Sequence, residues 1–220
     1  MNHVEPDLLF SGDDTAGRSV TNLYPRNETA GRVIGVTSAL HGEGVSTIAR
    51  RLALSLSQGD GEVILVKSAQ TRMAEEGGHG FSPMGIGRNP GIIDILSGSA
   101  TVEQATHCCS ATKLKQLTVA TARGRDGAVV QHRGWLSLLQ LIRKQHRWVL
   151  VDLPPVEEGV DALRVGQLLD GIILVIRANH TRAPVISRTY RAMVRCGINV
   201  HGAVLNRYEH VIPKWAYNRL

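Results

Sequence analysis

Short apolar runs rich in β-branched residues alternate with helical stretches from about residue 32 onward, and this alternation limits the fold more than any other feature. The runs occupy residues 33–37, 63–66, 117–120, 148–153, 172–176 and 200–205. Helical periodicity falls on residues 45–58, 134–145, 162–169 and 183–196. Buried strands alternating with helices form right-handed crossovers. We therefore predict an α/β fold with a doubly wound, mostly parallel sheet flanked by helices, in a single domain.

Composition agrees with this fold and excludes several others. Hydrophobic residues make up 43% of the 220-residue chain but aromatic residues only 4%, so the core consists of Val, Ile, Leu and Ala. So few aromatic side chains disfavour a stacking surface for single-stranded nucleic acid, and we expect no nucleic acid partner despite the net charge of +6. Three cysteines without metal-type spacing, and no N-terminal signal, favour a reducing cytoplasm.

The first part of the chain differs from the rest. Residues 1–30 are polar and lack sustained periodicity, so we expect a loosely ordered N-terminal arm there. Residues 31–220 carry the alternating pattern and form the predicted folded domain. Apolar runs such as residues 171–176 are far shorter than the roughly 18 residues of a membrane span, so we expect no crossing of a bilayer.

A glycine-rich turn links the first predicted strand to the first predicted helix. Its residues Gly42, Glu43, Gly44, Val45, Ser46 and Thr47 are candidates for binding a nucleotide. Glycines in this context let backbone N–H groups converge on phosphate oxygens at a helix N-terminus. The Ser46 hydroxyl occupies the position of an Mg²⁺ ligand in such loops. The consensus requires lysine where this chain has Val45, so the motif alone fits a simple tight turn equally well.

An acidic residue ends the fourth predicted strand. Asp152 follows the apolar residues 149–151. A carboxylate at the end of a buried strand beside a phosphate loop is the usual water-mediated metal contact of nucleotide hydrolases. Asp152 is therefore the candidate catalytic residue and, with Ser46, the candidate Mg²⁺ ligand. An Asp that caps the following turn is the alternative.

These segments resemble the cytoplasmic tyrosine autokinases of bacterial capsule and exopolysaccharide assembly, which are relatives of division-site and chromosome-partition ATPases with a deviant Walker A loop. The resemblance runs from about residue 33 to the C-terminus. It is carried by residues 42–47, 89–98, 151–156, 170–178 with Thr181, and 202–207. It implies a P-loop NTPase-like, tyrosine autokinase-like domain with ATP or ADP and Mg²⁺ as the ligand. Asn206 and Arg207 are further candidates for nucleotide binding, with Asn206 on the adenine side.

The chain departs from the family pattern at its most highly charged positions. Val45 stands where the family has lysine, and Lys67 and Ala69 stand where it has two aspartates. The C-terminal region contains Tyr208 and Tyr217 rather than a tyrosine cluster. Two interpretations of Lys67 stay open: it supplies the charge that the loop has lost from what we expect to be the neighbouring strand, or it points to solvent beside an inactive pocket.

These departures predict a degenerate, kinase-like P-loop protein that regulates or scaffolds polysaccharide biosynthesis and export. The resemblance implies a membrane polysaccharide co-polymerase, or its cytoplasmic segment, as the partner, and allows a homo-oligomer. Basic and apolar residues interleaved in residues 206–220 suit peripheral contact with the inner membrane face. One alternative is a slow ATPase or tyrosine autokinase with relocated active-site charges. A second is a partition-type ATPase associated with DNA or membrane.

Overall fold

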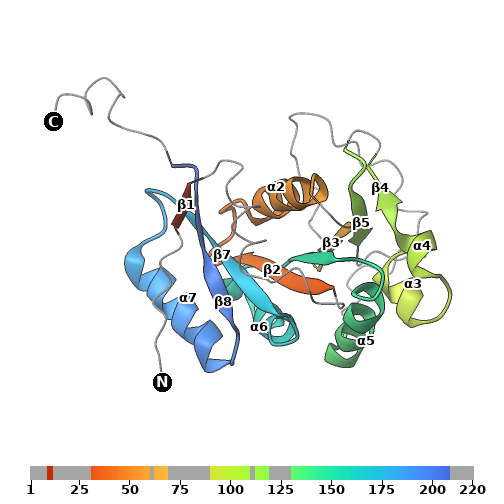
Figure 1. Cartoon of the computed structure of the whole chain (residues 1–220). Helices are drawn as coiled ribbons and strands as arrows, with labels where there is room; N and C mark the ends of the chain where they lie inside the picture. The colour runs from red at the N-terminus through yellow and green to blue at the C-terminus, as the bar shows by residue number, and fades with distance from the viewer. Residues whose placement is uncertain are drawn as a thin grey trace.

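An eight-stranded sheet forms the centre of the molecule in the computed structural model, which describes residues 9–11, 31–59, 62–68, 90–109, 112–118 and 130–208 (Figure 1). The strand order in these residues is β1-β8-β7-β2-β6-β3-β5-β4. All neighbours are parallel except β4 and β5. The strands are β1 (Leu9–Ser11), β2 (Arg32–Ser38), β3 (Val63–Lys67), β4 (His107–Cys108), β5 (Lys115–Thr118), β6 (Trp148–Asp152), β7 (Gly171–Arg177) and β8 (Val200–Asn206).

Helices cover both faces of this sheet (Figure 1). On one face lies α2 (Val45–Ser57), which contacts β2, β3 and β6. Its buried residues Ile48, Leu52 and Leu56 recur every four positions and so form a single apolar stripe. The opposite face carries α5 (His132–Ile142), α6 (Asp161–Gly166) and α7 (Ala183–Arg195), with the short helices α3 (Ile92–Leu96) and α4 (Val102–Ala105) beside α5 and a single 3₁₀ turn, η1 (Val156–Glu158), after β6.

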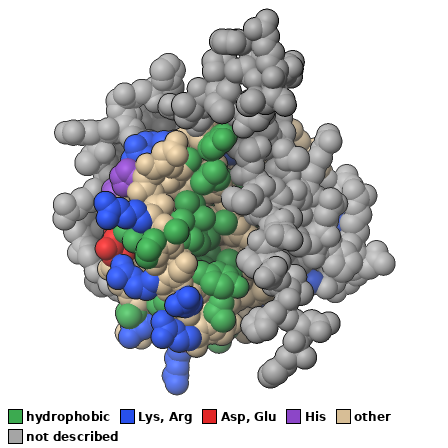
Figure 2. Space-filling view, turned by 90° about the vertical axis from the view of Figure 1, so that its left-hand side faces the viewer, with side chains coloured by type: hydrophobic (Ala, Val, Ile, Leu, Met, Phe, Trp, Pro, Cys, Tyr) green, Lys and Arg blue, Asp and Glu red, His purple; other side chains and the backbone are tan. Residues whose placement is uncertain are grey.

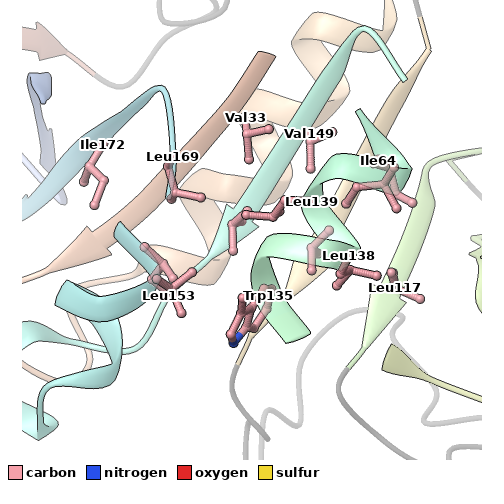
Figure 3. Close-up of a cluster of buried hydrophobic side chains, with 14 of the residues drawn as sticks. Val33, Ile64, Leu117, Trp135, Leu138, Leu139, Val149, Leu153, Leu169 and Ile172 are labelled. Atoms are coloured by element: carbon pink, nitrogen blue, oxygen red, sulfur yellow. The ribbon is translucent and has the colours of Figure 1, made fainter. Parts of the chain in front are cut away.

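The larger of the two apolar clusters lies on the face opposite α2 (Figure 3). Side chains of α5, including Trp135 and Leu138, pack there against Ile64 of β3 and Val149 of β6. Burying one such side chain stabilises the fold by about 1.5–3 kcal/mol. Because strand residues alternate between faces, the residues between these contact α2 instead, among them Leu150. The central strands are therefore covered on both sides.

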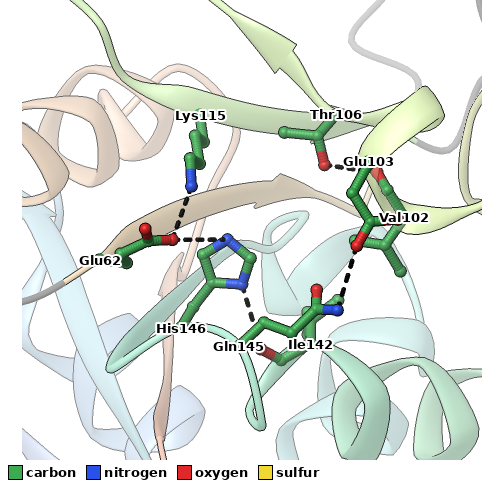
Figure 4. Close-up of polar contacts among 8 residues, drawn as sticks. All are labelled: Glu62, Val102, Glu103, Thr106, Lys115, Ile142, Gln145 and His146. Carbon is green, nitrogen blue, oxygen red and sulfur yellow. Dashed lines mark hydrogen bonds and ion pairs between the residues drawn. The ribbon is translucent and has the colours of Figure 1, made fainter.

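Polar networks hold the N-terminal ends of the strands, away from the edge where ligands bind in such sheets. The Lys115 ammonium lies 2.6 Å from a Glu62 carboxylate oxygen, and the buried His146 ring lies 3.9 Å from the same oxygen (Figure 4). Near the start of β2, the Asp170 carboxylate accepts from the Val33 N–H at 2.7 Å and from the Arg143 guanidinium. These contacts fix where β2, β3 and β6 begin.

The predicted fold class is confirmed, with some differences in the elements. All four predicted helices and all six predicted strands are present, with ends moved by up to three residues. The strand predicted over residues 117–120 begins earlier, at Lys115, and residues 119 and 120 lie outside the described ranges. Within the predicted loosely ordered arm, Leu9–Ser11 pair with β8, so these three residues belong to the sheet. The separation of residues 1–30 from a domain of residues 31–220 stays a prediction.

Candidate functional site

The candidate site lies at the carboxyl ends of β2, β6 and β3, beside the N-terminus of α2. Lys67 and Asp152 are partners in the register of β3 and β6. Each lies two positions after a residue that packs on the α2 side, Leu65 in β3 and Leu150 in β6, and residues two apart in a strand share a face. Their side chains therefore lie on the α2 side of the sheet, where α2 begins at Val45. Residues far apart in the chain thus meet at one edge of the sheet.

The turn between β2 and α2 depends on two glycines with left-handed backbone angles. Gly42 has φ 77° and Gly44 has φ 94°, a region in which residues with a side chain are strained. No side chain caps α2 at Gly44, and its first turn contains no acidic residue. The first N–H groups of a helix lack partners within the helix, and the helix dipole favours an anion at this end. The turn is therefore suited to a phosphate group.

The Glu43 side chain points into the protein rather than toward solvent. Its side chain is almost fully buried, with an exposed fraction of 1%. One carboxylate oxygen accepts from the Leu40 N–H at 2.9 Å, and the other accepts from the Arg177 N–H at 3.2 Å and from the Thr181 hydroxyl. Glu43 was predicted among the nucleotide-binding residues, but its carboxylate fastens the turn to the end of β7. Its side chain is thus engaged within the protein.

Asn206 reaches the same turn from the end of β8. Its side-chain amide donates to the Glu43 carbonyl at 2.8 Å. The contact is close, because a Cβ atom added to Gly44 would lie 2.2 Å from the Asn206 Nδ2 atom. The Arg207 N–H donates to the Asn206 Oδ1 atom at 2.9 Å, and the Arg207 side chain is exposed. The structure thus brings Asn206 to the turn; its predicted place beside adenine stays a prediction.

The two residues that follow Gly44 have opposite environments. Val45, at the position of the expected lysine, has an exposed fraction of 9% and belongs to the apolar cluster under α2. Ser46 is exposed and hydrogen-bonds to Asp152. The turn therefore offers a hydroxyl group but no side-chain cation at its helix end. Thr47 is partly buried in the first turn of α2.

Asp152 is a buried carboxylate with a nearby positive charge. Burial raises its pKa above the ordinary value, while the hydrogen bond from Ser46 and the charge of Lys67 lower the pKa in part. The Asp152 carbonyl accepts from both the N–H and the hydroxyl of Ser68, at 3.0 and 2.7 Å. These two bonds fix the ends of β3 and β6 against each other. Lys67 therefore acts on Asp152 from a defined position.

Strand order corrects one part of the interpretation of Lys67. We expected its strand to neighbour the strand before the glycine turn, but β6 lies between β2 and β3. The residue next to Lys67 is consequently Asp152 rather than the turn. A divalent cation at Ser46 and Asp152 would share the carboxylate with an ammonium group, so this donor set does not fit a resident Mg²⁺ ion well. Ala69 and Tyr217 lie outside the described residues.

Two residues that support the site through hydrogen bonds, Thr181 and Ser68, were not predicted as site residues. Thr181 was noted as part of the resemblance without a role, and the structure shows it holding Glu43. Ser68 was not singled out, because its hydrogen-bond partner, the Asp152 carbonyl, lies 84 residues later in the chain. Within the described ranges, His107, Cys108 and Cys109 form no metal-binding group, nor do any other His, Cys, Asp or Glu residues.

The surface around α7 is basic and partly apolar (Figure 2). Arg188, Arg191 and Arg195 are exposed on this helix, and Val194 has an exposed fraction of 49%. Figure 2 shows Lys and Arg side chains gathered around hydrophobic ones on this side of the molecule. None of the helices in the described ranges has the length and hydrophobicity needed to span a membrane.

The sequence is similar to those of several bacterial kinases. The tyrosine-protein kinase CpsD of Streptococcus agalactiae is 26% identical over 215 residues, covering 98% of this chain and 84% of that protein. The putative tyrosine-protein kinase EpsB of Ralstonia solanacearum is 22% identical over 194 residues, covering 88% of this chain but only 25% of EpsB. No protein-family model matches the chain.

Solved structures extend this similarity to the fold. The kinase domain of VpsO has a TM-score of 0.70 and 27% identity, covering 89% of this chain and 94% of that domain. The kinase domain of the Escherichia coli tyrosine kinase ETK has a TM-score of 0.71 at 19% identity, over 91% and 79% of the two chains. The septum site-determining protein MinD of Pyrococcus horikoshii, complexed with Mg-ADP, shares the P-loop fold with a TM-score of 0.58 at 18% identity, over 86% and 76%. The similarity in sequence over almost the whole chain and the shared fold together make this protein a relative of the bacterial tyrosine-protein kinases.

Proposed function

We propose that this protein is a non-catalytic relative of the tyrosine kinases, which binds ATP or ADP as a ligand and regulates or scaffolds the assembly and export of a bacterial polysaccharide. The observation that carries the proposal is the environment of Val45. This side chain lies at the helix end of the glycine turn and packs into the apolar cluster under α2. Because residue 45 is a valine, this position supplies no ammonium group to a terminal phosphate. The site keeps a phosphate-binding turn but lacks its usual cation.

The missing charge bears directly on catalysis. Phosphoryl transfer depends almost entirely on positioning and on cations that stabilise the transition state, and losing one such group costs orders of magnitude in rate. A second family residue is also replaced: the residue beside Asp152 at the end of β3 is Lys67, whereas the family that this chain resembles has an aspartate there. Holding a nucleotide requires less than transferring its phosphate. The site therefore favours binding over transfer.

A membrane polysaccharide co-polymerase is the partner that we propose. The region similar to this chain makes up a quarter of EpsB, so in that relative it is joined to a much longer chain. The basic surface with Arg188, Arg191 and Arg195 on α7 suits an acidic segment or the inner membrane face. The protein would then act at the cytoplasmic side of the membrane.

The test of non-catalysis is a mass measurement. After incubation with Mg-ATP, the intact mass of the purified protein should stay unchanged, while the ETK kinase domain, treated in parallel, should gain phosphate. Stoichiometric phosphate on Tyr208 or Tyr217 would refute the proposal. The partner is tested by binding to the cytoplasmic segment of a co-polymerase encoded next to this protein's gene. Charge reversal at Arg188 and Arg191 should weaken that binding, whereas reversal at Arg133, exposed on α5, should not.

A second function is favoured by one observation. Lys67 brings a positive charge to Asp152 from the neighbouring strand β3, and Asp152 hydrogen-bonds to Ser46, which follows the glycine turn. A slow ATPase or autokinase with such a relocated charge would release ADP under conditions in which the Lys67→Met variant does not. Equal ADP release from both proteins, at the level of buffer alone, would exclude this alternative.

A further inference from the structure

Lys67 and Asp152 form a charge pair at the point where a P-loop protein holds its metal ion. The two residues are register partners on adjacent strands, and their side chains project on the α2 side of the sheet. Ser68 holds the backbone of this pair in place through two hydrogen bonds to the Asp152 carbonyl. Lys67 is half-buried, and its positive charge acts on the Asp152 carboxylate. The arrangement is part of the folded sheet rather than of a free surface chain.

The third member of the group is Ser46, in the first turn of α2, which hydrogen-bonds to Asp152. A hydroxyl, a carboxylate and a cation thus meet beside the uncapped N-terminus of α2. In the usual arrangement the cation is a metal ion that neutralises both the carboxylate and the phosphates. In this chain the carboxylate already has a positive partner that is covalently part of the protein.

We propose that the Lys67 ammonium takes the place of the divalent cation, so that this site binds the phosphates of ATP or ADP without a metal ion. The inference rests on the proposed binding of nucleotide at the glycine turn. An ammonium has three N–H donors, enough to serve Asp152 and a phosphate oxygen together. It also screens the phosphates from the Asp152 carboxylate, which would otherwise repel them.

This arrangement reverses the usual effect of magnesium. A nucleotide that carries its own Mg²⁺ brings a second cation toward Lys67, and like charges in a partly buried site repel each other. Free ATP should therefore bind at least as tightly as Mg-ATP. Ordinary P-loop proteins would show the opposite order, because they use the metal to join phosphates, serine and carboxylate.

Calorimetric titration of ATP and ADP into the purified protein tests the proposal, once in EDTA and once in excess Mg²⁺. Binding in EDTA that is as tight as, or tighter than, binding in Mg²⁺ is the expected result. Binding that requires Mg²⁺ overturns the inference while leaving nucleotide binding intact. No binding under either condition overturns the proposed nucleotide binding, and the inference with it.

Two variants of Lys67 sharpen the test. Lys67→Met keeps the apolar stem but removes the charge, and it should weaken ATP binding in EDTA about ten- to a hundredfold, the range of a hydrogen bond to a charged group. Mg²⁺ should then restore binding, because Asp152 has lost its cation. Lys67→Asp should bind ATP only with Mg²⁺. Unchanged EDTA affinity in Lys67→Met would overturn the proposal.

The matched control is Lys144→Met, which removes one positive charge from an exposed position after α5, on the opposite face of the sheet. It should leave both affinities unchanged. A loss in this control equal to that in Lys67→Met would mean that net charge, not the position of Lys67, governs binding. Urea unfolding midpoints of all variants show whether the fold is kept.

Discussion

Replacing Gly44 by alanine is expected to destabilise the protein more than the same change at Gly42, although both glycines have left-handed backbone angles. The strain of such angles costs a residue with a side chain about 1–2 kcal/mol, and both variants share it. A Cβ atom at Gly42 meets nothing within 4 Å, whereas at Gly44 it would lie 2.2 Å from Asn206 Nδ2. The Asn206 side chain must therefore move and lose its bond to the Glu43 carbonyl, at a cost of about 0.5–1.5 kcal/mol. We expect totals of about 1–2 kcal/mol for Gly42→Ala and about 1.5–3.5 kcal/mol for Gly44→Ala.

Urea unfolding followed by tryptophan fluorescence measures both free energies, since Trp135 and Trp148 are buried. Repeating both substitutions in an Asn206→Ala background isolates the clash, because the difference between the two glycines should then vanish. Equal unfolding free energies for Gly42→Ala and Gly44→Ala in the otherwise unchanged protein would show that Asn206 does not pack against the turn.

Three further results are expected. Burial raises the pKa of Asp152 in the folded state, so its ionised form costs stability at neutral pH; Asp152→Asn should raise the melting temperature at pH 7, and this gain should shrink as the pH falls toward 4. Burial lowers the pKa of His146, so protonation of the ring opposes folding, and the melting temperature should fall as the pH drops below about 6.5. In His146→Gln the melting temperature should depend less on pH in this range, and an unchanged dependence would argue against a buried neutral ring. Val45→Lys alone should fail to restore tyrosine phosphorylation, as judged by intact mass, because Lys67 remains where an aspartate is needed; phosphate gain in this single variant would contradict the argument.

Much of the fold could be predicted because the central strands are buried on both faces. Their apolar runs are continuous, and the helices between them show the 3.6-residue period. The short helices α3 and α4 and the three-residue strand β1 were not predicted, since such lengths contain less than two periods of any pattern. Where the chain was long enough to repeat a pattern, the elements followed it.

The site was only partly readable from the sequence. Gly42, Gly44 and Asp152 are recognisable because each occupies a fixed place relative to a strand or helix. The inward orientation of Glu43 depends on partners at Arg177 and Thr181, more than 130 residues later in the chain. Strand order is likewise non-local, which is why the position of β6 between β2 and β3 did not follow from the pattern. Contacts of this kind are decided by the assembled sheet.

The buried Glu43 carboxylate has a consequence for the kinetics of binding. By joining Leu40, Arg177 and Thr181, it holds the glycine turn in shape before any ligand arrives. A turn that is already ordered loses little conformational entropy on binding. The observed rate of nucleotide association should therefore rise in proportion to concentration, without the plateau that a slow closing step produces. Glu43→Gln, which weakens these three contacts, should introduce that plateau.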